Sequence, residues 1–375
     1  MKRMRLYLLL AVCLPVLYNC FKLSPKEHTN PFDPANPDRV HLWWPLGTSL
    51  STGAATNINI AVDSAGIPYV IYADGGAGTD VIVKRYANSS WNTVGPAGIS
   101  GAAVKETAIG IDGSDNVFIV YTDAAGAHRC RKWDGSSWAA VGTQPVVASS
   151  AAFSTSLALF NGSPYIAYRS SASGQFLVTA YNTGTGLWGL VGAAVGNQAI
   201  FPRIVVLSGS TPPNKFPFVV YEEFSTFDFP NSYWYTNGGW SNRSTGVAQG
   251  FAPDIALDAG GTPYMSYLDS TSKPTVRKFV TAAWSAVGTT ALNTNAGSLR
   301  ITADASGTPY IVFRETLNGN VVTVMRYDGS AWAPAGARGF AGPVMSPCIA
   351  NGQGKLYVGF SDVGNAGRLS VYYYE

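Results

Sequence analysis

The sequence predicts an all-β protein, a seven-bladed β-propeller with four antiparallel strands in each blade. Three observations lead to this prediction. A segment like that at residues 67–72 occurs seven times, and its first aromatic residue recurs at intervals of 49, 47, 53, 46, 46 and 47 residues. Each copy lies in a unit of four strand-like pieces, and no long amphipathic helical pattern follows the first twenty residues. A four-stranded unit repeated around a ring is typical of a propeller. The first aromatic residues of the copies are Tyr69, Phe118, Tyr165, Phe218, Tyr264, Tyr310 and Tyr357.

The first repeat shows the four pieces in order. Residues 57–62 alternate between polar and apolar side chains, as a half-buried strand does. Residues 63–66 form a turn that ends in glycine, and residues 68–72 form a second, nearly continuous apolar strand. Residues 81–86 are the third strand, and residues 91–95 are a short fourth strand at the outer edge.

A tryptophan begins the fourth piece in six repeats, and in most of them an aromatic residue precedes it by five positions. Such side chains suit a lectin's sugar platforms, but every blade must also fill the same wedge. We therefore interpret them as core between blades. They are Trp91, Trp138, Trp188, Trp240, Trp284 and Trp332.

The two ends of the repeat region complement each other. The seventh repeat stops after its third strand, at residues 369–375, and lacks the tryptophan-containing fourth strand. A segment of that type, residues 42–47, precedes the first repeat. The sequence therefore predicts that an N-terminal strand closes the last blade, which leaves no open sheet edge between the first and last blades.

The spacing of tyrosine and tryptophan and the four-strand repeat resemble kelch-type propellers across residues 42–375. The diglycine that marks kelch repeats after the second strand is absent. Turns at residues 134–138 and 328–332 resemble the Asp-box of sialidase-like propellers but lack its full spacing. The resemblance implies a kelch-like bacterial propeller and no named enzyme family.

The N-terminus predicts export and anchoring to a membrane. Residues 1–19 read as a signal peptide, with a basic start and an apolar stretch too short for a confident membrane span. Cys20 follows in a setting that resembles a bacterial lipobox, and residues 20–40 form a proline-rich tether before the propeller at residues 41–375. We expect a lipid-anchored protein of the bacterial cell envelope, at the outer membrane or cell surface. The alternative is an ordinary secretory signal with an incidental cysteine.

Charge and cysteine content exclude some functions. Without residues 1–19 the chain has 22 basic and 22 acidic residues, whereas binding to nucleic acid needs a basic excess. Cys130 and Cys348 fall in different kinds of strand in non-adjacent repeats, so we expect two buried thiols and no disulfide.

Acidic residues recur two positions after the last aromatic residue of the second strand, at the turn toward the third strand. The face of the ring that carries these turns is called the top face below. The acids form either a ring that binds a cation, an amine or sugar hydroxyls, or a structural set that accepts hydrogen bonds from their own turns; we favour the structural set. The six residues are Asp74, Asp123, Glu223, Asp269, Glu315 and Asp362.

A second set of candidates is predicted to line the central channel from the first strand of each blade. Arg203 and Arg300 in this set suit a carboxylate or phosphate, which guanidinium groups bind with two parallel hydrogen bonds. Pairing with Asp254 or with the turn acids is the structural alternative. The predicted channel residues are Asn59, Ala108, Leu157, Arg203, Asp254, Arg300 and Pro347.

Blade four departs from the other repeats in its predicted loop at residues 222–234, which is rich in aromatic residues such as Phe227 and Trp234. Exposed aromatic side chains mark a contact surface for a sugar or a protein. The alternative is that they pack onto neighbouring blades.

Catalytic motifs are scarce. The chain has three histidines, none paired at metal-ligand spacing, and no nucleophile elbow or phosphate-binding loop. We expect no metal and no cofactor. We interpret the chain as a noncatalytic module that binds a glycan or a protein through its top face. The alternatives are a sialidase-like or lyase-like hydrolase centred on the channel, and a purely structural envelope protein.

Overall fold

The computed structural model describes residues 41–147, 151–208, 215–224, 228–289 and 292–375, and residues 42–375 form one compact unit. The predicted signal peptide, Cys20 and the tether lie outside the described residues, as does Phe227. Within the described part of the chain, no helix is long and apolar enough to cross a membrane.

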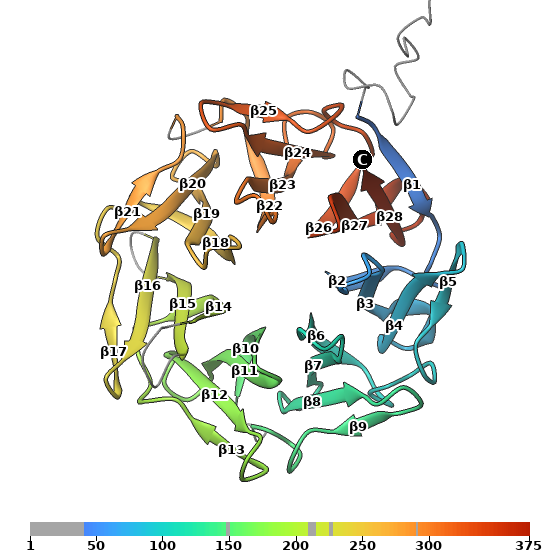
Figure 1. Ribbon diagram of the computed structural model, residues 1–375. Coiled ribbons are helices and arrows are strands. Elements are labelled where there is room, and N and C mark those ends of the chain that lie inside the picture. Colours follow the sequence, from blue (N-terminus) through green and yellow to red (C-terminus); the bar gives the residue numbers. More distant parts are fainter. Residues whose placement is uncertain (1–40, 148–150, 209–214, 225–227, 290–291) are drawn as a thin grey trace, which may run out of the picture. The chain divides into compact units, whose positions relative to one another are not determined.

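The described residues of this unit form seven sheets of four antiparallel strands, arranged as blades around a central space (Figure 1). The predicted fold is confirmed. The innermost strands are β2 Ala55–Val62, β6 Val104–Ile111, β10 Ala151–Phe160, β14 Ala199–Ser208, β18 Gly250–Leu257, β22 Ala296–Ala303 and β26 Val344–Gly352. The second strands are β3 Pro68–Asp74, β7 Val117–Asp123, β11 Ser163–Ser170, β15 Lys215–Glu223, β19 Pro263–Asp269, β23 Pro309–Glu315 and β27 Lys355–Asp362.

The outer half of each blade is shorter. The third strands are β4 Asp80–Ala87, β8 His128–Trp133, β12 Phe176–Asn182, β16 Phe229–Thr236, β20 Pro274–Val280, β24 Val321–Tyr327 and β28 Arg368–Tyr374. The outermost strands are β5 Ser90–Thr93, β9 Trp138–Ala140, β13 Leu187–Leu190, β17 Gly239–Asn242, β21 Ala283–Ala286, β25 Trp332–Pro334 and β1 Trp43–Gly47. Two short 3-10 turns follow second strands, η1 Gly75–Ala77 and η2 Val363–Asn365.

The second strand of each blade is the centre of the core, and β3 is buried along its whole length. Tyr69 and Ile71 pack in the cluster shared with blade two, whereas Val70 and Tyr72 pack in the cluster shared with blade seven. Because alternate side chains of a strand point to opposite faces of its sheet, a strand packed between two neighbouring blades must be apolar at every position. This explains why the repeated segment reads as a continuous apolar run.

The outer-strand tryptophans join each blade to the one before it. The indole Nε1 of Trp138 donates to the Val94 carbonyl at 2.9 Å, and that of Trp188 donates to the Val141 carbonyl at 2.7 Å. The same bond recurs from Trp43, Trp91, Trp240 and Trp332 to carbonyls of the preceding blade, and Trp284 donates instead to the Ser232 hydroxyl. The structure confirms their role as core between blades.

The closing strand lies where the sequence predicts it. β1 pairs antiparallel with the C-terminal strand β28, with Trp43 opposite Tyr374 and Trp44 opposite Tyr373 (Figure 1). The last blade therefore contains strands from both ends of the described chain, and its sheet order is β1-β28-β27-β26.

Both predicted thiols are buried and free of disulfides. Burial raises the pKa of the Cys130 thiol and raises that of Cys348 to about 12. Neither thiol has the lowered pKa that a nucleophilic cysteine needs.

Candidate functional site

Three of the predicted turn acids bond to backbone N–H groups of nearby turns. Asp74 is fully buried and accepts hydrogen bonds from the backbone of Thr52, Gly53 and Gly76 at 2.8 to 3.0 Å. Burial alone raises the pKa of Asp74, but these bonds outweigh it and hold the pKa below its usual value. Asp123 and Asp269 accept bonds from the backbone four residues later, which is typical of a carboxylate at the start of a turn.

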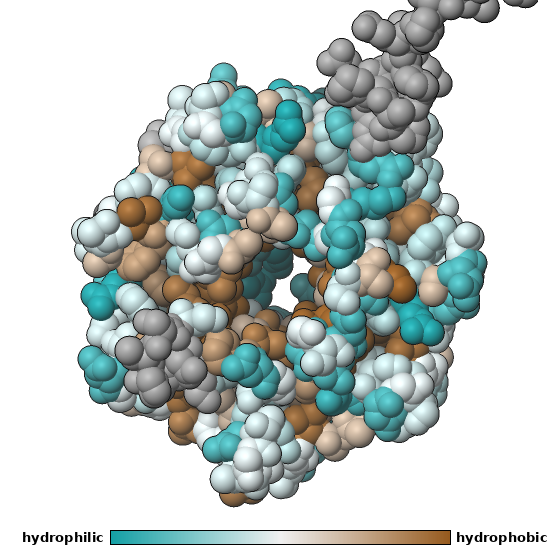
Figure 2. Space-filling model, viewed as in Figure 1, coloured by the Kyte–Doolittle hydropathy of each residue, from teal (hydrophilic) through white to brown (hydrophobic). Residues whose placement is uncertain are grey.

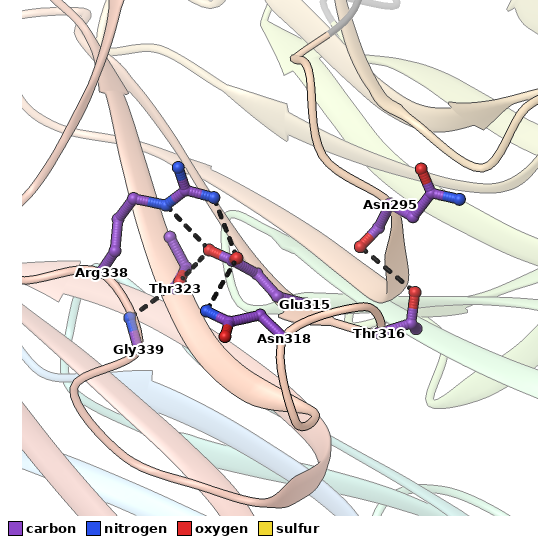
Figure 3. Close-up of polar contacts among 7 residues, drawn as sticks. All are labelled: Asn295, Glu315, Thr316, Asn318, Thr323, Arg338 and Gly339. Carbon is purple, nitrogen blue, oxygen red and sulfur yellow. Dashed lines mark hydrogen bonds and ion pairs between the residues drawn. The ribbon is translucent and has the colours of Figure 1, made fainter.

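Glu315 is the most enclosed of the other acids, with 2% of the residue exposed, and Figure 3 shows its surroundings. Arg338 donates two parallel hydrogen bonds to its carboxylate, at 3.0 and 2.9 Å. The Thr323 hydroxyl donates to the same carboxylate at 2.6 Å and accepts a bond from the Gly339 backbone at 3.0 Å. These donors fill both carboxylate oxygens and tie β23 to the loop after β25.

Glu223 and Asp362 have fewer protein donors. The Asn231 amide donates to Glu223 at 2.7 Å, and the Ser370 hydroxyl donates to Asp362 at 3.4 Å. Glu223 also lines a top-face pocket of about 310 Å3 with residues such as Phe229 and Asn231. The six turn acids belong to six different blades, and each accepts its hydrogen bonds near the end of the second strand of its own blade.

The channel prediction is close to the observed geometry. A cavity of about 180 Å3 is lined by six of the predicted residues, Asn59, Ala108, Leu157, Arg203, Asp254 and Arg300. Figure 2 shows the opening at the centre of the ring.

Blade seven lines the cavity with Cys348 rather than with the predicted Pro347. The turn between β26 and β27 is shorter than that of blade one, since Gly352 pairs with Lys355 whereas Val62 pairs with Pro68. Asn351, the residue matched to the turn aspartate of blade one, therefore lies in the ladder opposite Leu356, and counting four positions back from it gives Pro347, one residue before Cys348.

Two guanidinium groups and one carboxylate meet in this cavity. The Nε atom of Arg203 lies 3.6 Å from a carboxylate oxygen of Asp254, and about 18% of the Arg203 side chain is exposed. Burial and the nearby positive charge of Arg300 lower the pKa of Arg203 to about 10, although Asp254 opposes the shift. Arg203 remains charged at neutral pH.

The predicted blade-four loop is shorter than the sequence suggested, because β16 begins at Phe229. Trp234 therefore lies inside β16, where its ring packs against Phe216, Phe218 and Phe279. The structural alternative holds for Trp234: it is core between blades four and five. Phe224 and Phe229 at the two ends of the loop are exposed.

Sequence reasoning missed two grooves between blades on the face opposite the top face. The larger one, about 500 Å3, lies between blades three and four, and residues from the turns after β12 and β16 border it. The other, about 430 Å3, occupies the equivalent place between blades five and six. The lining of the larger groove includes Tyr165, Tyr181, Leu190, Tyr235 and Asn237.

The lining of the larger groove carries no charged side chain among the described residues, whereas the smaller groove includes Lys278 and Asp328. Leu190 on β13 is 64% exposed beside the larger groove. The available signals were two large apolar residues in one outer strand, Leu187 and Leu190, since the position that matches Leu190 in blade two is Ala140.

His128 is a second residue that sequence reasoning left without a role. It is fully buried, lies 3.1 Å from the Thr155 hydroxyl, and meets the edge of the Tyr168 ring. Burial lowers its pKa to about 4, so the imidazole is neutral at neutral pH. Among the described residues, no group of three or more His, Cys, Asp or Glu side chains could hold a metal ion.

No family model matches the chain, and no curated protein matches it in sequence. Solved structures that it resembles include the SapL1 lectin in complex with alpha methyl fucoside, at a TM-score of 0.54 and 13% identity, over 77% of this chain and 98% of the lectin. AofleA from Arthrobotrys oligospora aligns at a TM-score of 0.52 and 12% identity, over 78% of this chain and 87% of that protein.

The β-propeller domain of the trilobed protease from Pyrococcus furiosus aligns at a TM-score of 0.55 and 8% identity, over 85% of this chain and 95% of that domain. That domain has an open velcro topology, whereas β1 closes the last blade here. At these identities the likeness shows the fold alone.

Proposed function

We propose that this propeller is a noncatalytic glycan-binding module and that its main sugar site is the groove between blades three and four. The observation that carries the proposal is the lining of that groove. Tyrosine rings lie beside polar groups such as Asn237, in a space of about 500 Å3 without charged side chains among its described residues. Sugars present apolar C–H faces and neutral hydroxyls, and concave sites of this size and composition suit small ligands.

The channel supports binding over catalysis. Glycoside hydrolysis usually requires two carboxyl groups on either side of the scissile bond. Asp254 is the carboxylate among the described residues that line the central cavity, and it already pairs with Arg203. The fold shared with a lectin solved in complex with alpha methyl fucoside adds support for a glycan ligand.

The proposal moves the ligand from the top face, where the sequence placed it, to the opposite face. The top-face pocket beside Glu223 is smaller, at about 310 Å3. It is the second place at which a sugar or a protein partner is tested.

Binding of the purified protein to a glycan array tests the proposal. Leu190→Arg fills the blade three–four groove with a charged side chain, and Leu190 is exposed enough for the fold to tolerate the change. We expect the affinity for the glycan bound on the array to fall at least about tenfold, which corresponds to about 1.4 kcal/mol. Ala140→Arg, at the matching position of blade two, should leave binding unchanged.

A blank array for the unmodified protein would refute the glycan proposal and favour a protein partner or a structural role. If binding survives Leu190→Arg but disappears in Glu223→Gln, the glycan site is on the top face and the proposed groove is wrong.

We further propose that Cys20 carries a lipid that anchors the propeller to the bacterial cell envelope, supported by the basic and apolar stretches before it. Cys20→Ala is expected to move the protein from the membrane fraction to the soluble fraction, because the variant lacks the residue that would carry the lipid. Cys13→Ala, within the apolar stretch, is the matched control. If the Cys20 variant is processed normally and still stays with membranes, this anchor is wrong.

A further inference from the structure

The central cavity holds more positive than negative charge at its wall. Arg203 on β14 and Arg300 on β22 enter it from blades four and six, and Asp254 on β18 enters from blade five between them. Other polar residues in the lining, such as Asn59 and Ser156, are neutral.

Asp254 is largely occupied by protein partners. One of its carboxylate oxygens lies 3.6 Å from Arg203, a long ion pair, and the other accepts a hydrogen bond from the Ile301 backbone at 3.0 Å. Arg300 donates from Nη1 to the Leu299 carbonyl at 3.1 Å. A carbonyl does not neutralise a guanidinium group, so Asp254 balances about one of the two positive charges.

The next carboxylate is engaged elsewhere. Glu106 on β6 attracts Arg203, but its oxygens accept hydrogen bonds from the backbone of Ser154 and Thr155, at 2.8 and 2.5 Å. Those bonds hold Glu106 against the bulge at the start of blade three. Repulsion between Arg203 and Arg300 is therefore only partly relieved by the protein.

We propose that the channel binds a small oxyanion, of the phosphate or carboxylate class, between Arg203 and Arg300. Guanidinium groups bind such anions through paired, charge-assisted hydrogen bonds. The Ser156 hydroxyl accepts a bond from the Ile204 backbone at 3.2 Å, which leaves its proton free to be donated toward an anion. The cavity volume of about 180 Å3 is that of about six water molecules. It therefore fits one phosphate-sized group with part of its hydration shell and excludes a sugar chain.

Calorimetric titration of the full chain with inorganic phosphate, sulfate and acetate tests the proposal. Titration with chloride at the same ionic strength is the reference. We expect saturable binding that Arg300→Gln weakens about tenfold or more, since hydrogen bonds to charged groups are involved. Arg300→Lys keeps the charge without the planar fork and should bind with intermediate affinity. Arg85→Gln, an exposed arginine on β4, is the control for charge alone and should bind as the unmodified protein does.

A thermal melt separates this role from a structural one. In chloride alone, Arg300→Gln should melt at or above the temperature of the unmodified protein, because it removes a repulsion. Phosphate should then raise the melting temperature of the unmodified protein and of Arg85→Gln but not that of Arg300→Gln. The proposal is overturned if phosphate does no more than chloride, or if Arg300→Gln binds phosphate as tightly as the unmodified protein.

Two further arms identify the source of the anion and keep this inference separate from the glycan proposal. Tighter binding of glucose 6-phosphate than of inorganic phosphate would overturn the size argument and place the oxyanion on a larger ligand. Leu190→Arg should bind phosphate normally, and Arg300→Gln should retain the glycan-array signal, because the groove and the channel share no lining residue.

Discussion

Replacing Trp43 by alanine is expected to lower the free energy of unfolding by about 3–5 kcal/mol, the usual cost of removing a buried tryptophan side chain. Trp43 lies on the closing strand and is 9% exposed. Its ring stacks on Phe340 at a centroid distance of 4.2 Å, and its Nε1 donates to the Ala335 carbonyl at 2.7 Å. The variant therefore loses the contact that holds β1 against blade six.

Trp44→Ala is the matched control, since Trp44 is the next residue of the same strand and is 45% exposed. It should cost less than about 1 kcal/mol. Deletion of residues 41–48 should destabilise the protein more than Trp43→Ala, because it also uncovers the edge of β28. Urea unfolding, followed by circular dichroism, measures all three. Equal stabilities for Trp43→Ala and Trp44→Ala would contradict the role of the buried Trp43 ring, and an unchanged stability after the deletion would show that the closing strand does not restrain the ring.

Periodicity made the fold predictable. A ring of equal blades must repeat its wedge-filling residues, so the apolar second strand and the outer tryptophan recur at nearly constant spacing. Closure of the ring was also predictable. The last repeat lacks its fourth strand and the first repeat is preceded by an extra strand, so the two are expected to pair. The same repetition explains the turn acids: Asp74 and Glu315 are enclosed by donors of nearby segments, as a repeated structural need requires.

The candidate site was less predictable, because its geometry depends on local irregularities and on pairs of blades. The short turn between β26 and β27 shifts one channel position, and β16 extends back to Phe229 and takes Trp234 into the core. The groove between blades three and four combines Tyr181 with Tyr235 from neighbouring blades. In the sequence these tyrosines look like ordinary partners of the outer tryptophans, and the space between them appears only when the blades are placed side by side.

In most blades a glycine ends or follows the outer strand, and replacing it by alanine should cost much stability for so small a change. Gly95 has a φ of 76°, and a Cβ at this position would lie 2.7 Å from the Trp133 ring and 2.9 Å from the Trp138 ring. Both rings belong to the next blade, and Trp138 donates to the carbonyl of the residue before this glycine. Gly142, Gly192, Gly288 and Gly336 meet the tryptophan of the following blade in the same way.

Gly95→Ala is expected to cost about 2–5 kcal/mol, from about 1–2 kcal/mol for the left-handed backbone and about 1–3 kcal/mol for overpacking. Gly78→Ala isolates the backbone part, because Gly78 has a φ of 70° with nothing within 4 Å of its added Cβ. The difference between the two variants in urea unfolding measures the clash with the next blade. If both variants lose the same stability, the tryptophan of one blade does not require a glycine in its neighbour, and the spacing of the blades must then be set by the second-strand core alone.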